Sequence, residues 1–181
     1  MAYTIADPQP GYTPIANVDA GILVPVTVSN GTTTTIPTPP NQLGAIVKAV
    51  DPTYGQGEFV FLLGVASLAV GNLVTWNAAT YQAVLPTFAQ AGKSGESVAF
   101  AMSTPTATQY GWFQISGTAV ALKLTATAVS ANKPIGYIST NVVGRTLTSG
   151  RQILNAKSGA SSKATGTGVT VVCNRPCIAQ S

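Results

Sequence analysis

The strongest constraint on the fold is a succession of short β-rich runs, separated by turn-forming residues, that starts at Leu43. Apolar and polar or small residues alternate within these runs, as at Val98, Phe100 and Met102, which is the two-residue period of a half-buried strand. No segment carries a sustained apolar stripe with the 3.6-residue period of a helix. We predict strands over Ala45–Val50, Glu58–Gly64, Leu73–Asn77, Tyr81–Leu85, Ser97–Met102, Gly111–Ser116, Thr118–Thr125, Pro134–Thr140 and Val169–Cys173.

Many short strands at close spacing, with turn signals at Gly71-Asn72 and Ser116-Gly117, are typical of a small barrel or sandwich. The sequence therefore predicts an all-β protein, in which a small antiparallel β-barrel or sandwich domain spans residues 43–181. Residues 143–168 are rich in Ser, Thr, Gly and Ala, and we expect them to form a long loop within that domain.

Residues 1–42 differ from the rest of the chain, because they contain seven prolines, which forbid helix interiors and remove backbone donors. Within them, Ile22–Ser29 and Thr32–Ile36 flank Asn30-Gly31, a pair that favours the tight turn of a β-hairpin. Pro25 restricts the first of these strands to an edge. We expect an extended proline-rich N-terminal arm that carries one hairpin and needs a partner surface to bury it.

Charged residues make up only 8% of the chain, against about 25% in an ordinary globular protein. A surface with so few charges is poorly protected against association, which favours a protein that is largely covered by partners. All five carboxylates lie in the first 96 residues, whereas seven of the nine Lys and Arg residues lie after them. This polarity suits head-to-tail contacts between copies, or a basic face against an acidic partner.

The residues that usually perform catalysis are scarce. The chain has no histidine, which removes the commonest general base and most catalytic metal sites. Asp51 and Glu58 could form a glycosidase pair, but the turn between them makes solvated carboxylates the simpler interpretation. Cys173 and Cys177 are too few to hold zinc, and two free thiols are favoured over a short-range disulfide in a reducing cytoplasm. We expect no enzymatic activity, catalytic residue, cofactor or metal.

No membrane segment is expected, because the longest apolar run, Phe59–Val70, is shorter than the roughly 20 residues of a spanning helix. The first residues lack the basic start and apolar core of a secretion signal, so we expect synthesis in a cytoplasm. Nucleic-acid binding is disfavoured, because the cations are sparse and have few aromatic neighbours.

Three segments carry a resemblance to a known family. Gly57–Trp76, Gln109–Val120 and the closing Val169–Pro176 resemble the capsid cement, or decoration, proteins of tailed bacteriophages. The resemblance covers about residues 43 to 140 and the last strand, and it does not extend to the proline-rich arm. It implies a compact β-domain that binds the outside of a capsid, often as a homotrimer, and clamps neighbouring subunits of the major capsid protein. The chain would then be a structural virion protein located on the capsid exterior.

Partner contacts are predicted from two sets of side chains. Aromatic and apolar residues of the arm would meet a partner surface, and four cations six residues apart would lie on one face if the chain were extended there. The candidate partner-binding residues are Tyr3, Tyr12, Ile22, Val24, Arg145, Arg151, Lys157 and Lys163. The alternative for the four cations is a coincidental spacing on a solvated loop. The alternative for the whole protein is a receptor- or glycan-binding module of a phage fibre or tail, which would show solvent-facing aromatics beside Asp or Asn.

Overall fold

The computed structural model shows an all-β protein, and no helix occurs among the residues that it describes. Those residues are 4–5, 22–27, 33–86, 95–123, 128–139, 142–144, 151–163 and 165–179. The strands are β1 (Thr4–Ile5), β2 (Ile22–Thr27), β3 (Thr33–Thr38), β4 (Ile46–Asp51), β5 (Gly55–Leu63), β6 (Leu73–Trp76), β7 (Ala83–Val84), β8 (Ala99–Ala101), β9 (Tyr110–Leu122), β10 (Pro134–Ser139), β11 (Val142–Gly144), β12 (Gln152–Ser158) and β13 (Gly168–Ile178).

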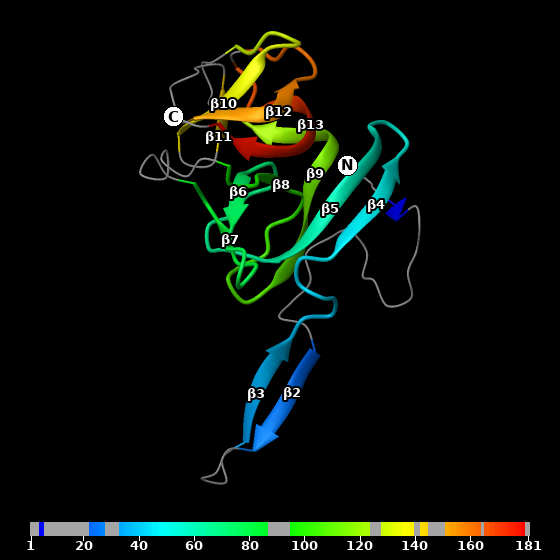
Figure 1. Ribbon diagram of the computed structural model, residues 1–181, viewed down its shortest axis with the longest axis vertical. Coiled ribbons are helices and arrows are strands. Elements are labelled where there is room, and N and C mark those ends of the chain that lie inside the picture. The colour runs from blue at the N-terminus through cyan, green and yellow to red at the C-terminus, as the bar shows by residue number, and fades with distance from the viewer. Residues whose placement is uncertain are drawn as a thin grey trace.

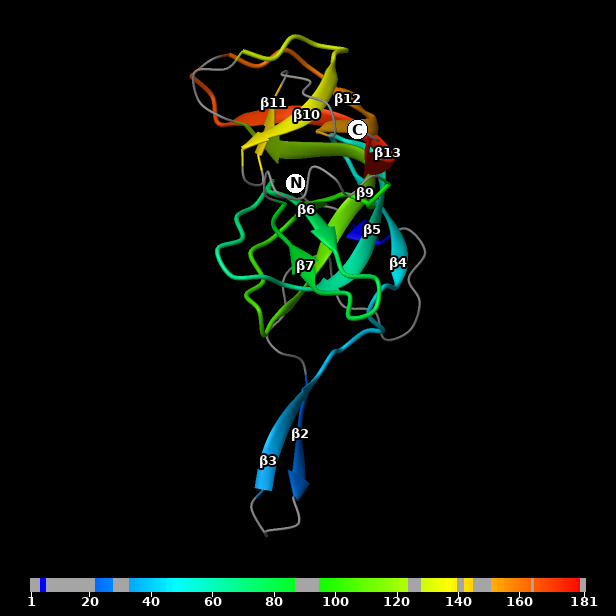
Figure 2. The ribbon, with the colours of Figure 1, turned by 60° about the vertical axis from the view of Figure 1, so that its left-hand side comes forward.

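The main sheet is antiparallel and curls into a half-barrel, as Figures 1 and 2 show. Its strands follow the order β1-β4-β5-β9-β13-β12-β10-β11, and β8, β6 and β7 extend from β9 as a side branch. The predicted all-β class and barrel-like architecture are therefore confirmed. The strands β2 and β3 form a separate two-stranded sheet, which stands apart from the body in both views.

The long strand β9 connects the two ends of the body. Its first half pairs with β5, and its second half, from Ser116 to Leu122, pairs with β13. Our prediction of two strands separated by a turn at Ser116-Gly117 is wrong, because the chain bends there without reversing. Gly117 has a φ of 94°, which glycine adopts at bends in strongly curved sheets. Buried Gln114 stabilises the bend, since its Nε2 donates to the carbonyl oxygens of Ser116 (3.1 Å) and Thr118 (3.0 Å).

The neighbouring strands are irregular along the same line. The pairing of β5 with β9 shifts between Glu58 and Phe59, and the pairing of β12 with β13 shifts between Leu154 and Ala156. Asn155 and Arg175 adopt positive φ angles of 57° and 47°. Bulges of this kind increase the local twist and bend a strand. Four adjacent strands therefore bend together, and this bend curls the sheet.

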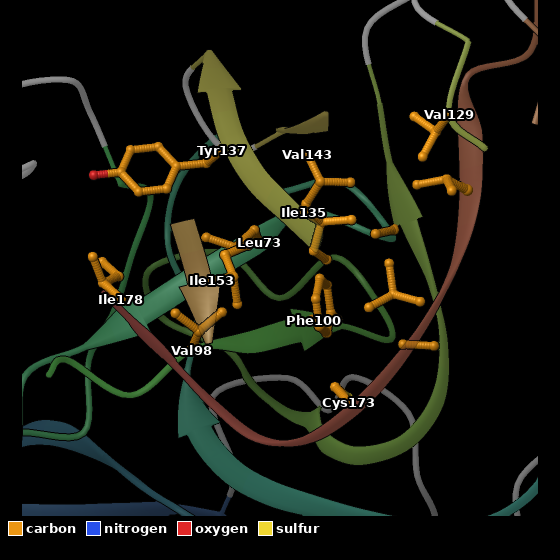
Figure 3. Packing of buried hydrophobic residues seen from close by; sticks show 14 residues of the cluster. Leu73, Val98, Phe100, Val129, Ile135, Tyr137, Val143, Ile153, Cys173 and Ile178 are labelled. Carbon is orange, nitrogen blue, oxygen red and sulfur yellow. The ribbon is translucent and has the colours of Figure 1, made fainter. Parts of the chain in front are cut away.

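The buried side chains form three clusters. One lies within the curl of β9, β10, β12 and β13, where Tyr137, Phe100 and Ile153 pack with other buried apolar side chains (Figure 3). The other two clusters cover opposite faces of β5 and the first half of β9. The strand sequences explain this, because β5 reads Phe-Val-Phe-Leu and β9 reads Trp-Phe-Gln-Ile, with large side chains on both faces.

The expected long loop over residues 143–168 is wrong in two places. Strand β12 occupies Gln152–Ser158 and lies between β13 and β10 in the main sheet, and the edge strand β11 extends to Gly144. The bulge at Asn155 interrupts the alternation of β12, so its sequence does not show a two-residue period. The last strand is also longer than predicted, because β13 continues beyond Cys173 to Ile178.

In the arm, β2 and β3 pair as an antiparallel hairpin, with Val24 opposite Ile36 and Thr27 opposite Thr33. The Asn30-Gly31 turn itself falls outside the described residues. One feature of the arm was not predicted: strand β1 pairs with the edge of β4, with Thr4 opposite Val50.

Candidate partner-binding surfaces

The two-stranded sheet of β2 and β3 contains the candidate residues Ile22 and Val24. Among the described strands, β2 and β3 pair only with each other, so each has one edge without a strand partner. Pro25 therefore occupies an edge strand, as predicted. An isolated two-stranded hairpin is marginally stable in water. Its sequence, Ile-Leu-Val-Pro-Val-Thr, is that of a strand which packs against another surface.

Three of the candidate residues, Tyr3, Tyr12 and Arg145, lie outside the part of the chain that the structure describes. The predictions for their side chains remain predictions.

The structure places Arg151 and Lys157 in different surroundings. Arg151 immediately precedes β12 and is half-buried, whereas Lys157 is exposed near the other end of that strand. The bulge at Asn155 reverses the alternation between them, so that Ile153 before it and Ser158 after it both point inward. Arg151 also acts on the interior: burial raises the pKa of Tyr137, and the nearby guanidinium of Arg151 partly offsets that shift.

The exposed cations of β12 and of the segments beside it are lysines. Lys157 lies opposite Pro134 in the pairing of β12 with β10, which brings it close to Lys133. Both lysines are exposed, and so is Lys163 in the segment between β12 and β13. No carboxylate side chain occurs after Glu96 in the sequence. An exposed basic surface attracts acidic groups in general, and salt screens that attraction. Lys133 was missed by the sequence analysis, since only strand register brings it to Lys157.

The carboxylates do not form a catalytic pair. Asp51 is buried and closes the β4–β5 turn, where its Oδ1 accepts the backbone N–H groups of Thr53 (2.7 Å) and Tyr54 (2.9 Å). Alternation along the hairpin places Glu58 on the opposite face, across from Lys48. Glu58 forms an ion pair at 3.1 Å with Arg175, across the bend of the sheet. Two carboxylates on opposite faces cannot flank one glycosidic bond.

The two cysteines are free thiols in different environments. Cys173 is buried in the core cluster, and burial raises the pKa of its thiol to about 12. Cys177 is half-buried farther along the same strand. The stretch of β13 between them is irregular, because Arg175 has a φ of 47° and the pairing with β12 shifts there. Both thiols are unbonded.

We expect a thiol-labelling reagent to modify Cys177 at neutral pH and to leave Cys173 unmodified in the folded protein. The reason is that thiolates react and thiols do not, and Cys173 is both buried and held protonated. Mass spectrometry would show one modified site under native conditions and two in denaturant, and Cys177→Ser would show none until unfolded. Equal labelling of both cysteines in the native protein would contradict the packing of β13.

The aromatic residues divide into core and surface positions. Trp112 and Phe113 are fully buried, and Tyr110 is nearly so, which makes them part of the core rather than interface anchors. Trp76 differs, because it is half-buried at the end of β6.

The described residues contain no cluster of three or more His, Cys, Asp or Glu side chains that would suit a metal ion. Nor does any described segment form a helix with the length and apolarity needed to span a membrane. Comparison of the chain with protein-family models, with curated proteins and with solved structures found no match.

Proposed function

We propose that this chain is a structural protein of a bacteriophage particle, which binds the outside of the capsid and stabilises contacts between neighbouring major capsid subunits. The observation that carries the proposal is the β2–β3 hairpin, which is built of apolar and β-branched residues and pairs with no other described strand. A hairpin of this kind gains stability by adding to, or packing on, a partner protein. The resemblance of residues 43–140 to cement proteins favours the major capsid protein as that partner.

The body of the molecule supports the same proposal. The sparse surface charge is accompanied by large exposed apolar side chains at Ile46, Val50, Leu154 and Val172. Glu58 is already paired, and Asp51 is occupied by the turn, so neither offers an acid or a base for chemistry on a substrate. Exposed apolar side chains on a poorly charged surface favour association, and we propose that the chain assembles as a homotrimer.

Removal of the hairpin tests the proposal. We expect a variant in which a Gly-Ser linker replaces residues 22–38 to remain folded but to bind capsids at least about 100-fold more weakly, a loss of about 2.7 kcal/mol. This variant retains β1, so the edge of β4 stays paired. Co-sedimentation with capsids that lack the protein measures binding, and circular dichroism measures folding.

The matched control is Lys157→Ala with Lys163→Ala, which changes the basic surface and leaves the arm intact. We expect this control to bind nearly as well at moderate salt, because screened surface charges contribute little. Undiminished binding of the hairpin-less variant would contradict the role of the arm. Light scattering tests the trimer, and a monomer both in solution and on the particle would contradict it.

A further inference from the structure

A groove beside Trp76 suggests a second binding activity. It has a volume of about 460 Å³, and the described residues that line it include Trp76, Asn77, Val84, Glu96 and Ser97. This volume lies in the range of about 300–1,000 Å³ that is usual for small-ligand sites. A second depression, of about 160 Å³, shares Trp76 and Ser97 with the first and continues to Ile46, Ile115 and Arg175. Trp76 therefore stands where two adjoining depressions meet.

Backbone hydrogen bonds fix the wall that carries Trp76. Trp76 pairs with Ala83 across β6 and β7, and the turn between these strands is closed by Asn77. The backbone N–H of Asn77 donates to the carbonyl of Gln82 (3.0 Å), and its side-chain Oδ1 accepts the N–H of Ala79 (2.8 Å). Because Oδ1 is used by the turn, the side-chain NH₂ group of Asn77 is the donor that this residue can offer to a ligand in the groove.

The opposite wall is equally fixed. The N–H of Ile178 donates to the carbonyl of Glu96 (3.0 Å), and the N–H of Val98 donates to the carbonyl of Pro176 (2.8 Å). These bonds attach residues 96–98 to the end of β13, and Ser97 pairs there with Cys177. Both walls are thus held before a ligand arrives, which lowers the entropy cost of binding.

The chemistry of the lining identifies the class of ligand. An indole ring presents a flat apolar face with a polar edge, and Glu96, Ser97 and Asn77 supply a carboxylate, a hydroxyl and an amide within the same groove. A sugar has the complementary form, since C–H groups cover its flat face and hydroxyls surround its edge. Among the described residues that line the larger depression, the one charged side chain is the carboxylate of Glu96, which disfavours an anionic ligand.

We propose that the Trp76 groove binds a neutral oligosaccharide. One sugar ring stacks on the indole of Trp76, and its hydroxyls donate to the carboxylate of Glu96 and accept from the amide of Asn77. The second depression extends the groove past Ser97, so a chain of two or more sugars fits better than a single one. This activity does not depend on capsid binding, and it would give the protein a contact with a glycan-covered surface.

The fluorescence of Trp76 can report binding of a ligand in the groove. The chain has two tryptophans, and Trp112 is completely buried in the core, so a ligand in the groove changes the fluorescence of Trp76 alone. The full chain is titrated with neutral tetrasaccharides of glucose, galactose, mannose and N-acetylglucosamine, and calorimetry is run in parallel. We expect at least one to bind with a Kd between about 10 μM and 1 mM, and to shift the tryptophan emission.

Three variants distinguish binding in the groove from binding elsewhere. We expect Glu96→Gln and Trp76→Ala each to weaken binding by about tenfold or more, and Trp76→Phe to retain part of it because an aromatic face remains. Tyr54→Ala, at the β4–β5 turn, is the aromatic control and should bind like the unchanged protein. Absence of binding to all four sugars at about 10 mM, or binding that Glu96→Gln and Trp76→Phe leave unchanged, would overturn the proposal. So would selective binding of a peptide or an anionic glycan in the groove.

Discussion

Substitution of Gly117 by alanine is expected to lower the free energy of unfolding by about 3 kcal/mol or more, which is exceptional for the addition of one methyl group. Two costs combine at this position. The φ of 94° is unfavourable for any L-residue that carries a Cβ, and an added Cβ would lie 2.3 Å from the carbonyl oxygen of Gln56. That oxygen belongs to the backbone of β5, so relief requires β5 and β9 to separate at the bend.

The matched control is Gly55→Ala in the β4–β5 turn. Its φ is 76°, similar to that of Gly117, but nothing lies within 4 Å of an added Cβ. We expect Gly55→Ala to cost about 1–2 kcal/mol, the conformational term alone. Urea denaturation of the two variants distinguishes the cost of the positive φ angle from the cost of the steric clash with β5. Equal losses for both would show that the bend of β9 tolerates a side chain and that the sheet curls elsewhere.

Substitution of Trp112 by alanine is expected to cost about 3–5 kcal/mol. The ring is fully buried, and its centroid lies 5.0 Å from that of Phe61, which in turn stacks on Tyr110 at 5.9 Å. Removal of the indole leaves a cavity in the buried cluster that covers one face of β4, β5 and the first half of β9. Loss of the native near-ultraviolet circular dichroism at lower urea concentration would record the effect.

Trp76→Ala provides the comparison, since it removes the same side chain from a half-buried position. We expect it to cost less than half as much, because less apolar surface leaves water when Trp76 folds into place. If the two variants were equally stable, Trp112 would not be a core residue, and the assignment of aromatic residues to core and surface would be wrong.

Regular strands were easier to predict from the sequence than irregular ones. Strands β4, β6, β8 and β10 were predicted because alternation and flanking turn residues are local properties of the chain. The bend in β9 was predicted to be a turn, because a Ser-Gly pair is compatible both with a turn and with a bend inside a strand. Strand β12 was missed because extra residues between Ile153 and Lys157, relative to the paired strand β10, interrupt its alternation.

The candidate surfaces were harder to predict, because register and bulges determine which side chains meet. The even spacing of Arg151 and Lys157 would place both side chains on one face of a regular strand. The bulge between them reverses the alternation, so they lie on different faces. Trp76 and Glu96 are 20 residues apart in the sequence and share a groove only because β13 holds residues 96–98 in place. The absence of histidine, by contrast, is a property of composition and needed no structure to be seen.

The central claim is that the chain binds an assembled capsid and stabilises it. A protein that bridges neighbouring subunits binds the lattice better than the free subunits, so mass action stabilises the lattice, and many modest contacts act together. The most direct measurement is the thermal opening of particles with and without this protein, followed by release of DNA, at low and at high salt. We predict that particles lacking the protein open at a lower temperature, and that moderate salt reduces the difference only slightly because apolar contacts dominate. Identical opening temperatures for the two kinds of particle would contradict the claim.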